Sequence, residues 1–282
     1  METDTGMATL QWPSQRHKRE LASSGPTQYS YPFAELVDER TQSWPLVASP
    51  RNAAALLTLY LLMVRYAPKW MARHKPLQLR LPIFFYNLAM TLLNAHIWLE
   101  LYISARALKY NISCQPCRVS YDPYELRMAA AFWWFYISKL LEFSDTLFFI
   151  LRKKWSQLSF LHVYHHSTMF VLCWIIVKWI PTGSTFVPAI MNSFVHIIMY
   201  SYYALSTLGP RIQPFLWWKR YLTALQLLQF IIGLLWCVHA VLQRCEYQPW
   251  LSYTSVVYMI SFLYLFGRFY SQKYTKAAVK CE

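Results

Sequence analysis

Long runs of apolar residues, separated by short polar and basic stretches, dominate the sequence after residue 44. A helix needs about 20 mostly apolar residues to cross the hydrocarbon core of a bilayer. These runs reach that length and lack the alternation of barrel strands, so they predict membrane-spanning helices. The six clear runs are Leu81–Ile103, Leu126–Leu151, Leu158–Ile180, Phe186–Leu208, Tyr221–Leu242 and Leu251–Tyr270, and a weaker run with arginines near its ends is Val47–Ala67.

The apolar runs predict an all-α polytopic membrane protein with seven transmembrane helices. The composition agrees, because 56% of the 282 residues are hydrophobic and 14% are charged. Residues 1–43 are polar and irregular and contain no apolar signal-peptide core, so we expect a mostly disordered N-terminal tail. Residues 44–271 then form the seven-span domain, and residues 272–282 form a C-terminal tail.

The net charge of +14 raises the question of a nucleic-acid partner, but the placement of the basic residues argues against one. They gather in the loops that a seven-span topology puts on one side of the membrane, and the positive-inside rule makes that side the cytosol. We therefore expect the lipid bilayer as a partner, a lumenal N-terminus and a cytosolic C-terminus. The four basic groups comprise Arg65, Lys69, Arg73, Lys75 and Arg80; Arg152, Lys153 and Lys154; Arg211, Lys219 and Arg220; and Arg268, Lys273, Lys276 and Lys280.

The predicted lumenal loops carry three cysteines and a glycosylation sequon. Cys114 and Cys117 follow the second span, and Cys245 follows the sixth. Because disulfides form in oxidising compartments, we expect a bridge from Cys245 to one of the other two. The sequence Asn111-Ile112-Ser113 makes Asn111 a candidate for N-glycosylation.

Ionisable side chains inside membrane spans are costly and therefore mark candidate functional positions. The third span contains Lys139, Glu142 and Asp145 at intervals of three, so neighbouring members share a helix face. The alternative for this group is a self-neutralising structural ion pair. The sixth span begins with Thr223, Gln226 and Gln229, also every third residue, for which the alternative is hydrogen bonding between helices.

Histidines in the fourth span are the strongest signal of chemistry. His162, His165 and His166 are spaced by three and four, so they lie on nearly one helix face. The fifth span carries a polar stripe at similar spacing, made by Asn192, His196, Tyr200 and Tyr203.

Depth estimates bring the two spans' histidines together. At about 1.5 Å per residue, His165 lies about 10 Å in from Leu158, and His196 lies about 15 Å in from Phe186 at the opposite end. The imidazoles of His165 and His196 are therefore expected to meet somewhat on the cytosolic side of the midplane, in one shared site.

Two chemistries fit such a histidine cluster. Neutral imidazoles bind iron and zinc, which would suit a di-iron lipid desaturase or hydroxylase, but one dense histidine box offers few ligands and Lys139 would repel a cation. Alternatively, an imidazole attacks an activated acyl group, a second histidine moves protons, and a dry chamber protects the acyl-imidazole. A non-enzymatic seven-span receptor or transporter would share the topology without needing this cluster.

The polar residues of the third to sixth spans form four motifs in sequence order. They are Lys139-x-x-Glu142-x-x-Asp145-Thr146, His162-x-x-His165-His166, Asn192-x-x-x-His196-x-x-Met199-Tyr200-x-Tyr202-Tyr203 and Thr223-x-x-Gln226-x-x-Gln229. Together they resemble the ELO family of very-long-chain fatty acid elongases, over roughly residues 44–270. Residues 148–154 and 217–223 also resemble the branch of that family that acts on saturated and polyunsaturated very long chains.

The resemblance implies a 3-ketoacyl-CoA synthase of the endoplasmic reticulum membrane. Such an enzyme condenses a long-chain acyl-CoA with malonyl-CoA to 3-ketoacyl-CoA, CO2 and CoA, the first step of two-carbon elongation. It implies no cofactor, since both thioesters are substrates. The implied fold is six helices that form an inverted barrel around an acyl-CoA tunnel, with the first span outside. The implied partners are the ketoacyl reductase, dehydratase and enoyl reductase of the elongation cycle, and a second copy of the chain in a homodimer.

The resemblance also implies roles for individual residues. His165 would be the acyl-accepting nucleophile and His196 its catalytic partner, with His162 and His166 orienting and polarising the substrate and Asn192 beside them. Spacing alone does not distinguish His165 from His166. The residues implied to line the CoA and pantetheine channel are Lys139, Arg152, Lys154, Gln157, His162, Tyr202, Lys219, Thr223 and Gln226. Supporting polar residues would be Glu142, Asp145, Tyr200, Tyr203 and Gln229.

Two further expectations concern the lumenal side. The family disulfide matches Cys114 with Cys245, which leaves Cys117 as an additional thiol. The chain length of the substrate should depend on the depth of the tunnel and on bulky residues near its closed end, such as Trp236 and His239.

Overall fold

The structure, a computed structural model, describes residues 37–117, 119–243 and 249–275. Most of the predicted N-terminal tail, much of the C-terminal tail and Cys245 lie outside these residues. Regular structure in the described part is helical. The α-helices are α2 (Pro50–Ala72), α3 (Arg80–Ala107), α4 (Pro123–Leu141), α5 (Phe143–Leu151), α6 (Phe160–Trp179), α7 (Phe186–Ser206), α8 (Lys219–Leu242) and α9 (Pro249–Tyr270).

Each predicted apolar run corresponds to a helical segment whose ends lie within a few residues of the predicted positions. The third run is divided, because Glu142 forms a turn between α4 and α5, and the sequence pattern gave no sign of this break. Local capping fixes several helix starts. Asp122 accepts a hydrogen bond of 2.8 Å from the backbone N–H of Tyr124, and Pro123 occupies the first turn, where a missing N–H costs nothing.

Successive helical segments run in opposite directions, which gathers the basic loops at one end of the bundle. We call it the basic end: it holds the end of α2, the start of α3, the end of α5, the start of α6, the end of α7, the start of α8 and the end of α9. Backbone hydrogen bonding joins Leu77 to Leu151 there at 2.9 Å, and Lys153 Nζ donates to Ala72 O at 3.1 Å. The Arg80 guanidinium donates to the backbone carbonyls of Thr207 and Leu208 at the end of α7.

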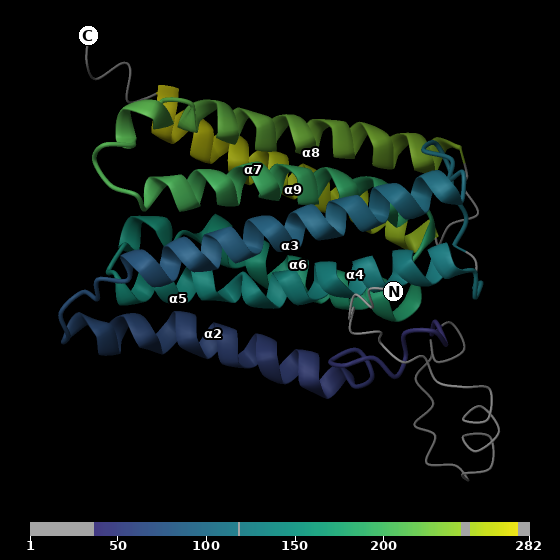
Figure 1. The fold of residues 1–282 in the computed structure, drawn as a ribbon, viewed down its shortest axis with the longest axis horizontal. Coiled ribbons are helices and arrows are strands. Elements are labelled where there is room, and N and C mark those ends of the chain that lie inside the picture. The colour runs from purple at the N-terminus through teal and green to yellow at the C-terminus, as the bar shows by residue number, and fades with distance from the viewer. Residues whose placement is uncertain (1–36, 118, 244–248, 276–282) are drawn as a thin grey trace, which may run out of the picture. The chain divides into compact units, whose positions relative to one another are not determined.

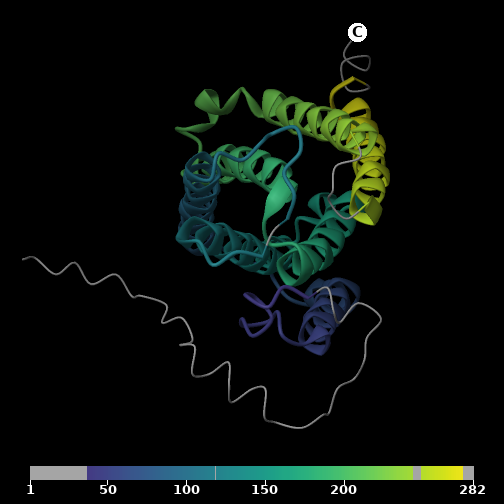
Figure 2. The same ribbon diagram turned by 90° about the vertical axis from the view of Figure 1, so that its right-hand side faces the viewer.

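Six helical segments pack as successive neighbours around a ring, with α4 and α5 counted as one segment. Helix α2 packs outside the ring against α5 and α6. Around the ring, α3 contacts α4 and α7, α4 contacts α6, and α8 contacts α7 and α9. Polar bridges join α6 to α9: Tyr164 Oη lies 2.9 Å from Ser261 Oγ, and Thr168 Oγ1 lies 2.6 Å from Tyr258 Oη. Figure 1 shows the helices lying lengthwise beside one another, and Figure 2 views the same helices nearly end-on.

A buried arginine holds the segment before α2 against the end opposite the basic end. Arg40 Nη2 lies 2.6 Å from Asp38 Oδ2 and 3.3 Å from Thr182 Oγ1, and Arg40 Nη1 donates to Ser120 O at 3.1 Å. Thr41 Oγ1 adds a bond of 2.6 Å to Val177 O in α6. A buried charge is tolerated when it is paired and fully hydrogen-bonded, and Arg40 meets both conditions.

The loop between α3 and α4 is tied to the loop between α6 and α7. Gly183 has a φ of +78°, and a Cβ at this position would lie 2.8 Å from Cys117 N, so only glycine allows this approach. Cys114 is disulfide-bonded, and its predicted partner Cys245 lies outside the described residues. Cys117 is a free thiol with its Sγ 3.3 Å from Thr182 Oγ1, and burial raises its pKa. The thiol form of Cys117 is therefore favoured.

The distribution of polar and apolar side chains is the reverse of that in a water-soluble protein. Leu242 is 75% exposed, whereas Lys139 is 1% exposed and Glu142 is fully buried. Among the described residues, two helical stretches are long and apolar enough to count clearly as membrane spans, Phe160–Trp179 and Gln213–Leu242. Several other predicted spans carry interior polar side chains, such as Asn87 and Asn94 in α3, which lower their hydropathy.

Candidate active site

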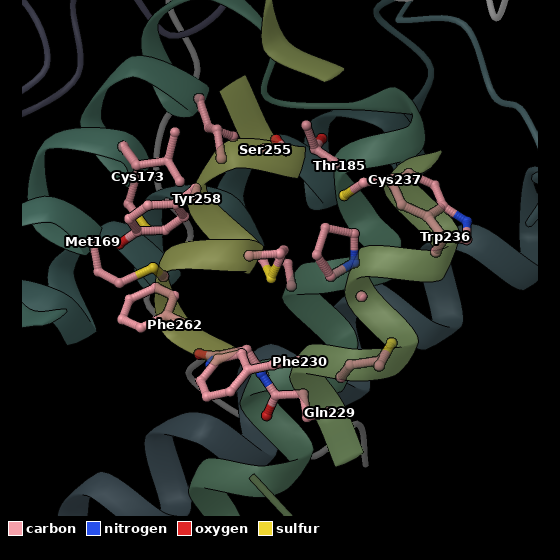
Figure 3. A pocket seen from close by; sticks show the side chains of 18 of the residues that line it. Met169, Cys173, Thr185, Gln229, Phe230, Trp236, Cys237, Ser255, Tyr258 and Phe262 are labelled. Carbon is pink, nitrogen blue, oxygen red and sulfur yellow. The ribbon is translucent and has the colours of Figure 1, made fainter. Parts of the chain in front are cut away.

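The ring encloses two adjoining cavities of different character. The polar chamber lies toward the basic end, and its lining includes histidines, tyrosines and glutamines of α6, α7 and α8. The apolar chamber is lined largely by hydrophobic side chains of α4, α6, α7, α8 and α9. Figure 3 shows Met169 and Cys173 of α6 together with Phe230, Tyr258 and Phe262 around the apolar chamber. The residues that line both chambers are His165, Asn192, Gln229 and Phe230.

The first turns of α6 place three histidines at the polar chamber. Ser159 caps the helix by accepting a hydrogen bond of 3.2 Å from the backbone N–H of His162, which fixes where the helix begins. The ring centroids of His162 and His166 are 4.2 Å apart, and those of His165 and His166 are 5.1 Å apart. Of the histidines in the described part of the chain, His165 is the one that lines both chambers.

His165 and His196 come together as the depth estimates predict. Their ring centroids are 6.4 Å apart, although the two residues enter the bundle from opposite ends. Within the described residues, the His165 ring nitrogens make no hydrogen bond, so a lone pair is available to a substrate. His166 Nδ1 also lacks a hydrogen-bond partner, so the feature that sets His165 apart is its position in the lining of both chambers.

Glu142, in the turn between α4 and α5, joins a buried cluster of charged and polar groups. Its Oε1 lies 2.7 Å from Lys139 Nζ and 3.1 Å from His196 Nδ1. Lys139 Nζ also donates to Asn192 Oδ1 at 3.1 Å. His196 Nδ1 also lies 3.4 Å from Lys139 Nζ, which only donates, so it is the shorter contact with the accepting Glu142 carboxylate that favours a proton on Nδ1 of neutral His196. His196 Nε2 is then unprotonated and able to act as a base.

Two other members of the histidine cluster have distinct polar neighbours. His166 Nδ1 lies 3.8 Å from Glu142 Oε2, which is too long for a direct hydrogen bond. His162 Nε2 lies 2.7 Å from Thr146 Oγ1. The adjacent histidines therefore present different chemistry to the same chamber.

Asp145 anchors Tyr200 of the α7 stripe. Tyr200 Oη donates to Asp145 Oδ2 at 2.7 Å, and the two tyrosine rings of Tyr200 and Tyr203 meet edge to face with centroids 6.0 Å apart. Both tyrosines line the polar chamber, as does Asp145. The predicted supporting residues Glu142 and Gln229 line it as well.

The structure gathers most, but not all, of the predicted substrate-binding residues. It places Lys139, Arg152 and Lys154 outside the lining of both chambers. Lys139 is buried with its ammonium bonded to Glu142 and Asn192, whereas Arg152 and Lys154 are exposed on the surface at the basic end. The predicted residues that do line the polar chamber are Gln157, His162, Tyr202, Lys219, Thr223 and Gln226.

Sequence reasoning missed residues that the bundle brings to the site from distant segments. Lys273, in the π-helical turn after α9, lines the polar chamber near its exposed mouth, and its charge was interpreted only as a sign of orientation. Of the two bulky residues predicted near the closed end of the tunnel, Trp236 lines the apolar chamber. His239 does not, and its Nε2 instead lies 2.6 Å from Ser113 Oγ. Asn111, the predicted glycosylation site, is exposed in the same loop.

A metal site requires several ligand side chains that converge on one point. In the part of the chain that the structure describes, no three His, Cys, Asp or Glu side chains are arranged to hold one metal ion. Glu142 Oε1, the carboxylate oxygen nearest the histidines, is already bonded to Lys139. An imidazole beside a second histidine that can accept a proton suits nucleophilic chemistry.

The fold and the site define a class of protein: a helical membrane protein whose histidine-lined chamber continues into an apolar one. The particular family follows from comparison with known sequences. The chain belongs to the ELO family, described as the GNS1/SUR4 family, whose profile matches residues 45–282.

Named relatives agree with this membership. The chain is 47% identical over 239 residues to very long chain fatty acid elongase 4 of Homo sapiens, covering 85% of this chain and 76% of the relative. It is 42% identical over 245 residues to very long chain fatty acid elongase 2 of Rattus norvegicus, covering 87% of each. It is 40% identical over 239 residues to very long chain fatty acid elongase 5 of Tachysurus fulvidraco, covering 85% of this chain and 81% of the relative.

The buried pair of Lys139 and Glu142 generates a stability prediction. Lys139→Met leaves the Glu142 carboxylate buried without its cation, so we expect the free energy of unfolding to fall by about 3–5 kcal/mol. The double variant Lys139→Met/Glu142→Gln should recover much of that loss, because the uncompensated charge is gone. Thermal unfolding of the purified protein in detergent measures both effects, with the exposed Lys75→Met as control. Equal losses in the single and double variants would contradict the electrostatic explanation.

Proposed function

We propose that this chain is a very-long-chain 3-oxoacyl-CoA synthase that condenses a long-chain acyl-CoA with malonyl-CoA. The observation that carries the proposal is the position of His165 at the junction of the polar and apolar chambers. An acyl-CoA has the same two parts, a polar pantetheine arm and an apolar chain, and its reactive thioester lies where they join. The family membership and the names of the relatives point to the same reaction.

The substrate would enter from the basic end. Lys219 and Lys273 at the mouth of the polar chamber carry charges that suit the phosphates of CoA. Tyr202, Thr223 and Gln226 supply hydrogen-bonding groups along the chamber for the pantetheine amides. The acyl chain would extend past His165 into the apolar chamber, so the thioester carbonyl would stop beside the imidazole.

The proposed mechanism has two steps. In the first, a His165 ring nitrogen attacks the thioester carbonyl, the bond from the carbonyl carbon to sulfur breaks, and CoA leaves as the thiolate. The proton on the other His165 nitrogen passes to a base, a role that His196 would take, leaving a neutral acyl-imidazole. In the second step, malonyl-CoA loses CO2, and the resulting carbanion attacks the acyl carbonyl. The new carbon–carbon bond forms as the bond to the imidazole nitrogen breaks, and His196 returns its proton to His165.

The surroundings of the cluster suit this sequence. Glu142 holds His196 with Nδ1 protonated, and Lys139 balances the carboxylate charge. An acyl-imidazole hydrolyses readily in water, so an enclosed chamber would protect it. The chemistry asks for no cofactor, because decarboxylation of malonyl-CoA supplies the driving force and the carbanion.

We further propose that the chain spans the endoplasmic reticulum membrane seven times, with a lumenal N-terminus and a cytosolic C-terminus. The six-segment ring would be an inverted barrel, with α2 as the outer span. Clustering of basic residues at one end of the bundle supports that orientation. The 3-ketoacyl-CoA product would pass to the reductases and the dehydratase of the elongation cycle, and the enzyme would form homodimers.

The reaction is tested with acyl-CoA of several chain lengths and labelled malonyl-CoA. We expect labelled 3-ketoacyl-CoA from the purified protein and at least about a thousandfold less from His165→Ala, because the proposed nucleophile is missing. His96→Ala, an exposed histidine of α3, is the matched control and should retain full activity. Absence of product from the unaltered protein, together with stoichiometric iron, would overturn the proposed function.

The covalent step is tested separately by intact mass spectrometry. Incubation with acyl-CoA alone should release CoA and add one acyl mass to the protein, and His165→Ala should show no such adduct. The same experiment on His166→Ala assigns the nucleophile between the two neighbours. If CoA is released only after malonyl-CoA has bound, the acyl-imidazole mechanism is wrong even if condensation occurs.

The apolar chamber predicts how chain length is limited. A Cβ on Gly233 of α8 would lie 3.4 Å from Met259 Sδ, so a larger side chain there projects into the chamber. We expect Gly233→Leu to reduce kcat/KM for the longest accepted acyl-CoA by about tenfold or more relative to shorter ones. Gly267→Leu is the control, because nothing lies within 4 Å of a Cβ at that position. An unchanged chain-length profile in Gly233→Leu would place the acyl chain elsewhere.

A further inference from the structure

Helix α2 lies outside the ring, yet one of its side chains reaches the histidine cluster through a single intermediate residue. Tyr60 Oη lies 3.1 Å from Thr146 Oγ1, and Thr146 Oγ1 lies 2.7 Å from His162 Nε2. Tyr60 is 2% exposed and Thr146 is fully buried. Neither residue lines the polar or the apolar chamber, so both act on a substrate only through His162.

The direction of the two hydrogen bonds follows from the donors available. A phenol has one O–H to donate, and a buried donor without an acceptor is costly. Among the described residues, Thr146 Oγ1 is the one hydrogen-bond partner of the Tyr60 hydroxyl. Tyr60 therefore donates to Thr146, and the Thr146 hydroxyl proton is directed to His162 Nε2. In this arrangement His162 Nε2 accepts, and a neutral imidazole carries its proton on Nδ1.

We propose that Tyr60 is a positioning residue of the active site, which fixes the tautomer and the orientation of His162 through Thr146. His162 lines the polar chamber, and its Nδ1–H would be the group that donates to a substrate oxygen. The opposite tautomer would present a lone pair at Nδ1 and repel a carbonyl oxygen. The inference rests on the proposed function, and it gives the outer helix a part in the chemistry.

Aromatic packing holds Tyr60 in place independently of its hydroxyl group. Its ring stacks on Phe143 with centroids 4.0 Å apart and an interplanar angle of 15°. Tyr60→Phe keeps this stacking and removes only the hydroxyl, so the relay can be broken with little change in packing. Thr146→Val likewise keeps the shape of the side chain and removes the hydroxyl.

Steady-state condensation kinetics of a double-mutant cycle test the relay. We expect Tyr60→Phe to lower kcat by about tenfold while KM for acyl-CoA stays within about twofold, because an oriented hydrogen bond is lost and the binding surface is not. Thr146→Val should lose at least as much, and the double variant should lose no more than Thr146→Val alone. Thr146→Ser, which keeps the hydroxyl, should restore most of the activity. Tyr66→Phe, an exposed tyrosine of the same helix, is the matched control.

A second measurement reads the tautomer without relying on activity. Nitrogen-15 NMR of histidine-labelled protein, with His162→Gln to assign the signal, should show His162 protonated on Nδ1 and should show both tautomers after Tyr60→Phe. The proposal is overturned if Tyr60→Phe matches Tyr66→Phe in kcat and in the His162 signal. It is also overturned if the losses of the two single variants multiply in the double variant. If the unaltered protein makes no 3-ketoacyl-CoA, the proposed function fails, and the NMR arm still decides whether Tyr60 controls His162.

Discussion

The buried pair between Lys139 and Glu142 is the interaction on which the rest of the site depends. Two charges taken out of water are stable together only when their attraction and their remaining hydrogen bonds offset the desolvation cost. Both side chains are almost completely buried, and their 2.7 Å contact is completed by Asn192 on the ammonium and His196 on the carboxylate. Because Lys139 lies in α4, Glu142 in the turn before α5, and the other two in α7, satisfying the pair also fixes these helices relative to one another. The same contacts that make the charges tolerable orient the proposed base.

This constraint explains why part of the sequence could be interpreted correctly and part could not. The helices were predictable because a membrane-spanning helix requires a long apolar run. The histidines could be identified as candidate site residues because ionisable groups inside such runs are costly and usually functional. The meeting of His165 and His196 followed from the helix rise and the opposite directions of the two spans. The break at Glu142 was not predictable, since the apolar run continues through it. The site also depends on which way side chains turn between helices, and spacing along one helix does not contain that information.

Lys139 shows the consequence most clearly. The family resemblance implied that Lys139 binds substrate, and the alternative from spacing was an ion pair with Glu142. The structure commits its ammonium to Glu142 and Asn192. The assignment of basic loop residues to a phosphate site has the same weakness, since Arg152 lies at the correct end of the bundle but outside the lining of both chambers. Lys273, far along the sequence, lines the mouth instead. Charge patterning predicts the correct end of the molecule, whereas helix packing selects the individual residue.

The three histidines of the α6 motif thus have three different environments. His162 faces the hydroxyl of Thr146, His166 faces a carboxylate oxygen at 3.8 Å, and His165 has open access to both chambers. A neutral imidazole can donate, accept or attack, and its neighbours select among these properties. Because the neighbours come from α5, α7 and the turn between α4 and α5, the motif in α6 supplies the functional groups and the surrounding segments assign their roles. The outer helix α2 therefore matters to the site in the same way as the helices of the ring, since Tyr60 is the far end of the hydrogen-bond chain that reaches His162.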